Sequence, residues 1–225
     1  MAEPGRDDVL TPGERDLPTD RRLLLAAERL FAAHGVGAVS LRTVISAAGA
    51  NVASVHYHFG SKEELLAALL RDRTDALHRR RMALMDAVLA GGDPTCRDIA
   101  DGLARPLLEL VEQGAADWVR VVGQILTTRS LGPQLGAVFE GQWRDWDRIY
   151  GLARPELTAS TRAFRLAQAL DTSIGVLGAA EGYADWLGQS GPGGVAVVYG
   201  ELVDAVVGML EAESTRRSDT AHSNT

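Results

Sequence analysis

Residues 51–58 include small and hydrogen-bonding side chains of the types that contact DNA bases and phosphates. On a helix over 51–59, Val52, Val55 and Phe59 share one side, which leaves the other side to polar and small residues. Small residues let a helix approach the floor of a groove, and hydroxyl, amide and imidazole groups contact base edges or phosphates. The predicted outer side consists of Ala53, Ser54, Tyr57 and His58, with Asn51 and His56 at its edges.

Positive charge flanks this polar surface, and no negative charge interrupts it. No Asp or Glu lies between Thr43 and Lys62. Arg42 stands near the N-terminus of a predicted short helix that Ser40 caps, and Lys62 opens the long helix that follows. Helix N-termini also offer free N–H groups to phosphate. Ser40, Arg42, Thr43 and Lys62 therefore complete the predicted DNA-binding set, and solvated surface charge is the alternative for Arg42 and Lys62.

Three short helices are predicted to position these residues. The first helix follows Thr19, an N-cap residue, and stops at Gly35, which suits a positive φ. The second follows Ser40 with an apolar stripe at helical spacing, and Gly49-Ala50 makes a tight turn into the third. Helices joined in this way form a helix-turn-helix, whose second helix enters the major groove of DNA. An ordinary three-helix packing unit with a basic surface is the alternative.

Residues 19–66 resemble the TetR family of bacterial transcriptional regulators. The resemblance rests on Ser40-Leu41, on Ala48-Gly49 and above all on the run Tyr-His-Phe-Gly-Ser-Lys at 57–62. It implies a fold of nine or ten helices, a homodimer, and a C-terminal domain that senses a small molecule and releases DNA. Many members have Tyr where this chain has His56, so either His56 or Tyr57 takes the phosphate contact that the family ascribes to the tyrosine.

The rest of the chain is predicted to be helical as well. Segments with helical periodicity alternate with connectors that contain Gly or Pro, and none shows the alternation typical of strands. The prediction is an all-α protein with an N-terminal three-helix helix-turn-helix DNA-binding domain and a C-terminal helical ligand-binding and dimerisation domain. The predicted divisions are a flexible tail at 1–18, the DNA-binding domain at 19–65, the effector-binding and dimerisation domain at 66–213, and a second flexible tail at 214–225.

The net charge of −7 is unevenly distributed along the chain. Residues 1–18 carry −3, residues 19–81 carry +4 and residues 82–225 carry −8. The basic segment contains the predicted DNA-binding residues, and such a segment is where a polyanion docks. The run Arg79-Arg80-Arg81 within it is predicted to be the solvated side of the long helix rather than a nucleic-acid patch.

Aromatic side chains recur on one side of a predicted helix in the acidic part of the chain. They predict either the lining of a pocket, for an effector with apolar or aromatic character, or ordinary core packing. Residues on two neighbouring predicted helices are candidates to complete the pocket. The candidate ligand-binding residues are Phe139, Trp143, Trp146 and Tyr150 on the aromatic helix, with Trp118 and Gln124 on one neighbour and Phe164 and Asp171 on the other.

The last two predicted helices, over 157–187 and 195–213, are rich in small and apolar residues. The resemblance implies that they pair with their symmetry mates as a four-helix bundle between subunits. Packing within one chain is the alternative. The residues concerned are Ala167, Leu170, Ile174, Leu177 and Gly178, and then Val195, Leu202, Ala205, Val206 and Met209.

Other classes of protein are disfavoured by what the sequence lacks. No run of 18 apolar residues exists, so no transmembrane helix or membrane partner is expected, and residues 1–20 are not a secretory signal. The single cysteine, Cys96, argues against disulfides and a cysteine-based zinc site. The motifs Gly-x-x-x-x-Gly-Lys-Ser/Thr, Gly-x-Ser-x-Gly and His-Glu-x-x-His are absent, as are paired metal ligands, so no enzyme, metal or cofactor is predicted. The prediction is a cytoplasmic homodimeric repressor that its effector releases from a palindromic operator. There are two alternatives. One is an enzyme with a vestigial helix-turn-helix, and the other is an activator or architectural DNA binder without an effector.

Overall fold

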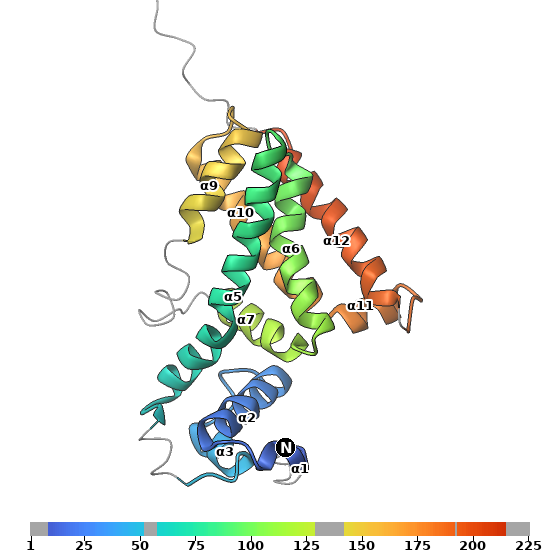
Figure 1. The fold of residues 1–225 in the computed structure, drawn as a ribbon. Coiled ribbons are helices and arrows are strands. Elements are labelled where there is room, and N and C mark those ends of the chain that lie inside the picture. The colour runs from blue at the N-terminus through green and yellow to red at the C-terminus, as the bar shows by residue number, and fades with distance from the viewer. Residues whose placement is uncertain (1–8, 52–57, 129–141, 192, 215–225) are drawn as a thin grey trace, which may run out of the picture. The chain divides into compact units, whose positions relative to one another are not determined.

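The computed structural model of the chain describes residues 9–51, 58–128, 142–191 and 193–214. Every regular element in these ranges is an α-helix, so the predicted all-α fold is confirmed (Figure 1). The helices are α1 (Pro12–Arg15), α2 (Thr19–His34), α3 (Leu41–Ala47), α5 (Lys62–Gly91), α6 (Cys96–Glu112), α7 (Ala116–Thr128), α9 (Gln142–Ala153), α10 (Ala159–Leu177), α11 (Ala180–Trp186) and α12 (Gly194–Glu211).

The chain divides into two compact units. Unit 1 comprises residues 1–75 and 114–138, and unit 2 comprises residues 76–113 and 139–225. α5 therefore contributes its first part to unit 1 and its second part to unit 2. The sequence predicted one boundary at residue 65, whereas the structure groups α7 and the beginning of α5 with the DNA-binding helices.

Unit 1 is built on α2, which packs against α3 and α7. Leu23, Ala27 and Phe31 are fully buried and follow one another at intervals of four residues, so they form the apolar stripe of α2. The predicted stop at Gly35 is present, with φ of 88°. α3 begins as predicted, because the Ser40 hydroxyl accepts a hydrogen bond from the Thr43 amide at 3.1 Å.

A short helix, α1, lies in the segment that the sequence assigns to a flexible tail. The Glu14 carboxylate accepts two hydrogen bonds from the Arg29 guanidinium, at 2.6 and 2.7 Å. Arg29 also donates to the carbonyl of Val9, and Leu10 is buried. Residues 9–15 are thereby fixed to α2. The pattern of residues could not predict this contact, because its two partners are separated by 15 positions.

We expect the attachment of α1 to weaken in acid. The hydrogen bonds from Arg29 lower the pKa of Glu14 from 4.5 to about 2. A lowered pKa in the folded state contributes stability above the unfolded pKa, and this stability is lost as the pH falls through the folded value. The attachment should therefore loosen between about pH 4.5 and pH 2. Amide hydrogen exchange at residues 9–15, corrected for intrinsic rates, measures it. Glu14→Gln should abolish this pH dependence, and equal profiles for both proteins would contradict the prediction.

Unit 2 has α6, α10 and α12 in mutual contact, with α9 against α6 and α10 and with α11 against α12 (Figure 1). Thr95 caps α6 with a reciprocal hydrogen-bond pair to Asp98, and Thr158 caps α10. The helix predicted over 157–187 is interrupted after Leu177, and α11 begins at Ala180. Six of the ten small and apolar residues predicted for a subunit interface are buried within unit 2, so packing within the chain is confirmed for Leu170, Ile174, Leu177, Gly178, Leu202 and Val206.

Three donors converge on one carbonyl in the last turn of α12. The hydroxyl of Tyr150 donates to the Leu210 oxygen at 2.7 Å, and Arg154 and Arg165 donate to the same atom at 2.9 and 3.0 Å. Tyr150 and Leu210 are fully buried. The last carbonyls of a helix have no partner in the helix itself and carry negative partial charge, so these donors satisfy and stabilise the end of α12.

Replacing Tyr150 with phenylalanine should lower the free energy of unfolding by about 1 kcal/mol. The ring still fills its buried site, and the carbonyl of Leu210 keeps two charged donors, so only the hydroxyl's hydrogen bond is lost. Urea denaturation of both proteins measures the difference. A loss as large as that of Tyr150→Ala would contradict this account, because the hydroxyl would then matter as much as the whole ring.

Candidate functional site

The N-terminus of α3 is the part of the predicted DNA-binding surface that the structure defines best. Ser40 and Thr43 share two hydrogen bonds, one from the Thr43 amide at 3.1 Å and one between their hydroxyls at 2.8 Å. Arg42 is exposed in the same turn and makes no hydrogen bond or ion pair with any described residue. A guanidinium whose donors are not used by any described residue, beside a helix N-terminus, suits a phosphate.

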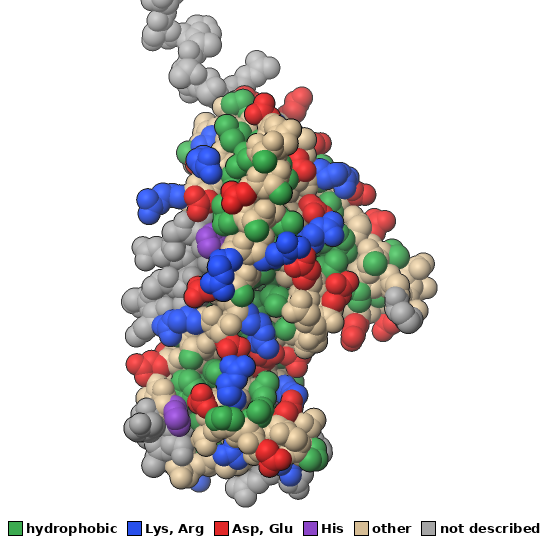
Figure 2. Space-filling view, viewed as in Figure 1, with side chains coloured by type: hydrophobic (Ala, Val, Ile, Leu, Met, Phe, Trp, Pro, Cys, Tyr) green, Lys and Arg blue, Asp and Glu red, His purple; other side chains and the backbone are tan. Residues whose placement is uncertain are grey.

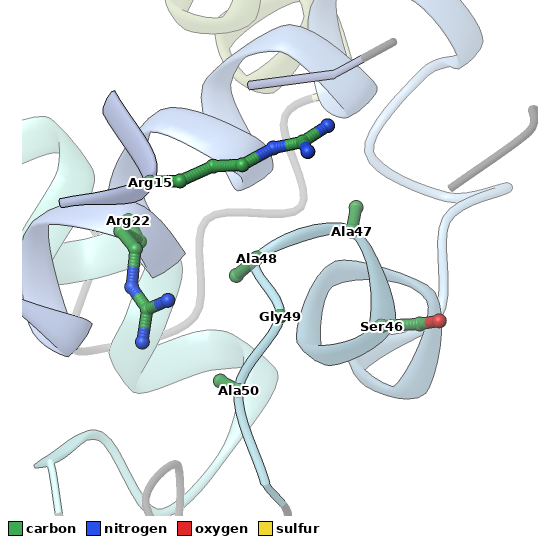
Figure 3. A pocket seen from close by; sticks show the side chains of 7 residues that line it. All are labelled: Arg15, Arg22, Ser46, Ala47, Ala48, Gly49 and Ala50. Carbon is green, nitrogen blue, oxygen red and sulfur yellow. The ribbon is translucent and has the colours of Figure 1, made fainter. Parts of the chain in front are cut away.

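A cavity of about 460 Å³ lies beside the turn that follows α3 (Figure 3). It is lined by Arg15, Arg22 and residues 46–50. Gly49 has φ of 59°, in the left-handed region that a tight turn requires. Arg22 donates to the Thr19 hydroxyl at 3.3 Å, while its Nε atom is buried without a hydrogen-bond partner. Two arginines thus place positive charge next to the turn of the helix-turn-helix.

Lys62 is held by its own unit in this structure. Its ammonium donates to the Val36 carbonyl and lies 5.6 Å from the centroid of the Phe31 ring. Beside it, the Ser61 hydroxyl accepts a hydrogen bond from the Glu64 amide at 3.1 Å at the start of α5. Lys62 must therefore exchange internal contacts for a phosphate if it binds DNA. Sequence reasoning missed these contacts, because they join α5 to the end of α2.

Most of the predicted recognition segment falls outside the described residues. Ala53, Ser54, His56 and Tyr57 lie in 52–57 and are not described. The two flanking candidates, Asn51 and His58, are described and exposed. Exposure is what base or phosphate contact requires of them. The choice between His56 and Tyr57 stays a prediction.

Two of the predicted ligand-binding residues take part in the packing of unit 1. Trp118 is 1 % exposed, and its indole N–H donates to the Leu69 carbonyl at 2.9 Å. The Gln124 side chain accepts from the Val36 amide at 3.2 Å and donates to the Ala32 carbonyl at 3.4 Å. Both side chains join α7 to other helices of unit 1, so their polar groups are already engaged.

The other predicted ligand-binding residues belong to unit 2 and differ in burial. Trp146 and Tyr150 are buried, whereas Trp143 is 40 % exposed. Phe164 and Asp171 are exposed on α10, and Phe139 lies outside the described residues. The structure therefore brings Trp146 and Tyr150 into the interior and leaves Trp143, Phe164 and Asp171 at the surface of the unit.

Positive and negative side chains alternate over the face shown in Figure 2, and no single basic patch stands out there. Ion pairs account for many of the arginines, among them Arg80 with Glu109 at 2.7 Å and Arg162 with Asp147 at 2.8 Å. The run Arg79-Arg80-Arg81 was predicted to lie on the solvated side of the long helix, and this holds for Arg79 and Arg80, which are exposed. Arg81 is 4 % exposed, so the prediction was wrong for this residue.

The described residues contain no group of three or more His, Cys, Asp or Glu side chains arranged to hold a metal ion. Within the same ranges, no helix is both long enough and apolar enough to cross a membrane. Cys96 is a buried free thiol.

A comparison with family models matches residues 23–69 to the bacterial regulatory proteins of the tetR family. The HTH-type transcriptional repressor KstR2 of Mycolicibacterium smegmatis is 34% identical over 79 residues, which cover 34% of this chain and 38% of that protein. KstR2 of Mycobacterium tuberculosis is 35% identical over 88 residues, which cover 39% of this chain and 36% of that protein. The chain thus matches less than two fifths of the length of these relatives.

Solved structures resemble the chain over more of its length. The ketosteroid transcriptional regulator KstR2 of Mycobacterium tuberculosis superimposes with a TM-score of 0.59 at 22% identity, over 85% of this chain and 94% of that chain. A tetR-family regulatory protein from Rhodococcus RHA1 gives a TM-score of 0.60 at 18% identity, over 88% and 100%. At these identities the likeness shows a shared fold.

Proposed function

The chain belongs to the TetR family of bacterial transcriptional regulators, and from this premise we propose that it is a repressor, released from a palindromic operator by a small-molecule effector. The observation that carries the proposal is the match over residues 23–69, within which α3 presents Arg42 without a partner among the described residues. Its matched relatives are described as repressors, which favours a regulator over an enzyme.

DNA binding in this proposal uses two copies of the helix-turn-helix. Each subunit places the segment 51–59 in the major groove, and two such segments reach successive grooves when they are about 34–36 Å apart. Phosphate contacts then fix the register, and base contacts select the sequence. The proposed contact residues are Ser40, Arg42, Thr43, Asn51, Ala53, Ser54, His56, Tyr57, His58 and Lys62.

The effector in this proposal is a small molecule of apolar or aromatic character that binds in unit 2. Trp146 supports this assignment, because it is buried in unit 2 and an aromatic ring can present a large apolar surface to a ligand. Trp118 and Gln124 are weaker candidates, since their polar groups already bind main-chain atoms of unit 1. The remaining candidates are Phe139, Trp143, Tyr150, Phe164 and Asp171.

The homodimer in this proposal forms through the last helices of the chain. Apolar side chains stay exposed on all three of them within the single chain, with Phe164 on α10 at 64 %, Trp186 on α11 at 80 % and Val197 on α12 at 41 %. Large apolar side chains left at the surface are typical of an interface that a partner covers. A second copy of the chain is the partner that a palindromic operator requires.

A gel shift with the DNA that flanks its own gene tests the proposed function. We expect a sequence-specific shift that unlabelled specific DNA competes away and random DNA does not. Adding extracts or compounds that contain the effector should release the DNA. Absence of any specific shift, across DNA from the whole neighbourhood of the gene, would contradict repression. A specific shift that no compound relieves would instead support a DNA binder without an effector.

A further inference from the structure

Unit 2 contains a buried cation that the described residues hardly compensate. Arg81, on α5, is 4 % exposed. Its one hydrogen bond runs from a terminal guanidinium nitrogen to the Leu103 carbonyl of α6 at 3.2 Å, and its Nε atom is buried without a partner. No carboxylate among the described residues pairs with it. Burial lowers the pKa of Arg81 to about 10, which leaves the guanidinium charged at neutral pH.

A second polar atom without a hydrogen-bond partner among the described residues lies one helical turn from Arg81. The Nδ1 atom of His78 is also buried without a hydrogen-bond partner. His78 and Arg81 are three positions apart on α5, so their side chains are neighbours on the same side of the helix. Two adjacent polar side chains with unmet hydrogen-bonding capacity are uncommon in an interior, where polar groups are nearly always satisfied.

Apolar side chains and a glycine of α6 lie next to this pair. Met85 follows Arg81 by one turn of α5, and Gly102 precedes Leu103, whose carbonyl Arg81 binds. A Cβ atom at Gly102 would lie 2.4 Å from the Met85 methyl carbon and 3.2 Å from the Trp146 ring, so both side chains pack against this glycine. A cation and an apolar surface are therefore close together.

Leaving a charged group buried and unpaired is unfavourable, because it loses hydration without gaining an opposite charge. A bound water, an ion or a ligand can compensate such a group, and unpaired buried charges are accordingly candidates for functional sites. The guanidinium has donors only, in a planar arrangement that fits a carboxylate or a phosphate through two parallel hydrogen bonds.

We propose that Arg81 binds the carboxylate of an amphiphilic effector, with His78 as a second hydrogen-bonding group and with Met85 and Trp146 in contact with the apolar part of the molecule. This inference rests on the proposed function, since it names the chemical class of the effector and one end of its site. An organic carboxylate supplies the missing negative charge, and its apolar body fits the side chains beside the cation.

The first test needs no ligand and compares Arg81→Met with Arg79→Met. Methionine keeps an unbranched apolar stem without the charge, and Arg79 is an exposed neighbour on the same helix that serves as the control. We expect the melting temperature of ligand-free Arg81→Met to equal or exceed that of the wild type, because the unpaired charge is removed. A fall in melting temperature for Arg81→Met but not for Arg79→Met would overturn the proposal, since Arg81 would then be a structural donor to α6.

The second test uses decanoate as the probe and 1-decanol as its uncharged match. Saturating decanoate should raise the melting temperature of the wild type and of Arg79→Met by about 5 °C. Arg81→Met should lose this shift, and 1-decanol should raise the melting temperature of none of the three proteins. Equal stabilisation by decanoate of Arg81→Met and the wild type, or no stabilisation of the wild type, would overturn the proposal.

Operator binding separates this inference from the proposed function. Arg81→Met without ligand should bind the operator as the wild type does, and decanoate should release the wild type only. If no protein binds DNA specifically while decanoate still stabilises the wild type through Arg81, the carboxylate site stands and the repressor function fails. If both proteins bind the operator and decanoate releases both equally, the repressor function stands and the carboxylate site fails.

Discussion

Replacing Trp118 with alanine is expected to lower the free energy of unfolding by about 3–5 kcal/mol. The side chain is 1 % exposed, and its indole N–H donates to the Leu69 carbonyl at 2.9 Å, so the substitution removes a large buried surface and a hydrogen bond together. A cavity in a packed interior adds to the loss, because the surroundings relax only in part. Urea denaturation, followed by far-ultraviolet circular dichroism, measures the change.

Trp143→Ala is the matched control, since it truncates the same side chain at a position that is 40 % exposed. We expect a loss of about 1 kcal/mol or less for this variant. Trp118→Phe adds a second control, because it keeps most of the ring volume and removes only the N–H donor. Equal losses for Trp118→Ala and Trp143→Ala would show that burial in unit 1 does not determine the stability of the chain.

Replacing Arg42 with alanine is expected to weaken operator binding and to reduce its dependence on salt. A dimer would lose two phosphate contacts, which lowers the slope of log K against log salt by about 1.8. When the salt concentration rises from 50 to 200 mM, both proteins lose affinity. The factor by which affinity falls should be about tenfold smaller for the variant than for the wild type. Fluorescence anisotropy with labelled operator, repeated across this range of salt, measures both slopes.

Arg71→Ala is the control for Arg42→Ala, because Arg71 is also exposed but lies on α5, outside the helix-turn-helix. Its slope should equal that of the wild type. An unchanged slope in Arg42→Ala would remove Arg42 from the phosphate-contacting set. A reduced slope in both variants would indicate that distributed charge, and not the start of α3, controls binding.

Local signals made the secondary structure predictable. Ser40 caps α3 at the position that the sequence indicated, and Gly35 ends α2. Each of these features depends on one side chain and a backbone group within a few residues. The prediction joined α10 and α11 into one helix, because the apolar periodicity continues through Gly178. In the structure the helical backbone stops after Leu177 and resumes at Ala180.

Contacts between distant residues were not predictable from the same patterns. A helical stripe identifies which side of a helix is apolar, but not what covers that side. The pairing of Glu14 with Arg29 fixes a segment that composition assigns to a tail. Arg81 is buried although it ends a run of three arginines, because α6 covers that side of α5. Trp118 and Trp146 look alike in the sequence and lie in different units.

The position of Lys62 makes the protein suitable for selective chemical labelling. Lys62 is the only lysine in the sequence, so an acylating reagent for lysine amines has a single side chain to modify. Its ammonium is half-buried, donates to the Val36 carbonyl and lies against Phe31, so acylation requires this contact to open first. The rate of labelling therefore reports how often the junction between α2 and α5 opens.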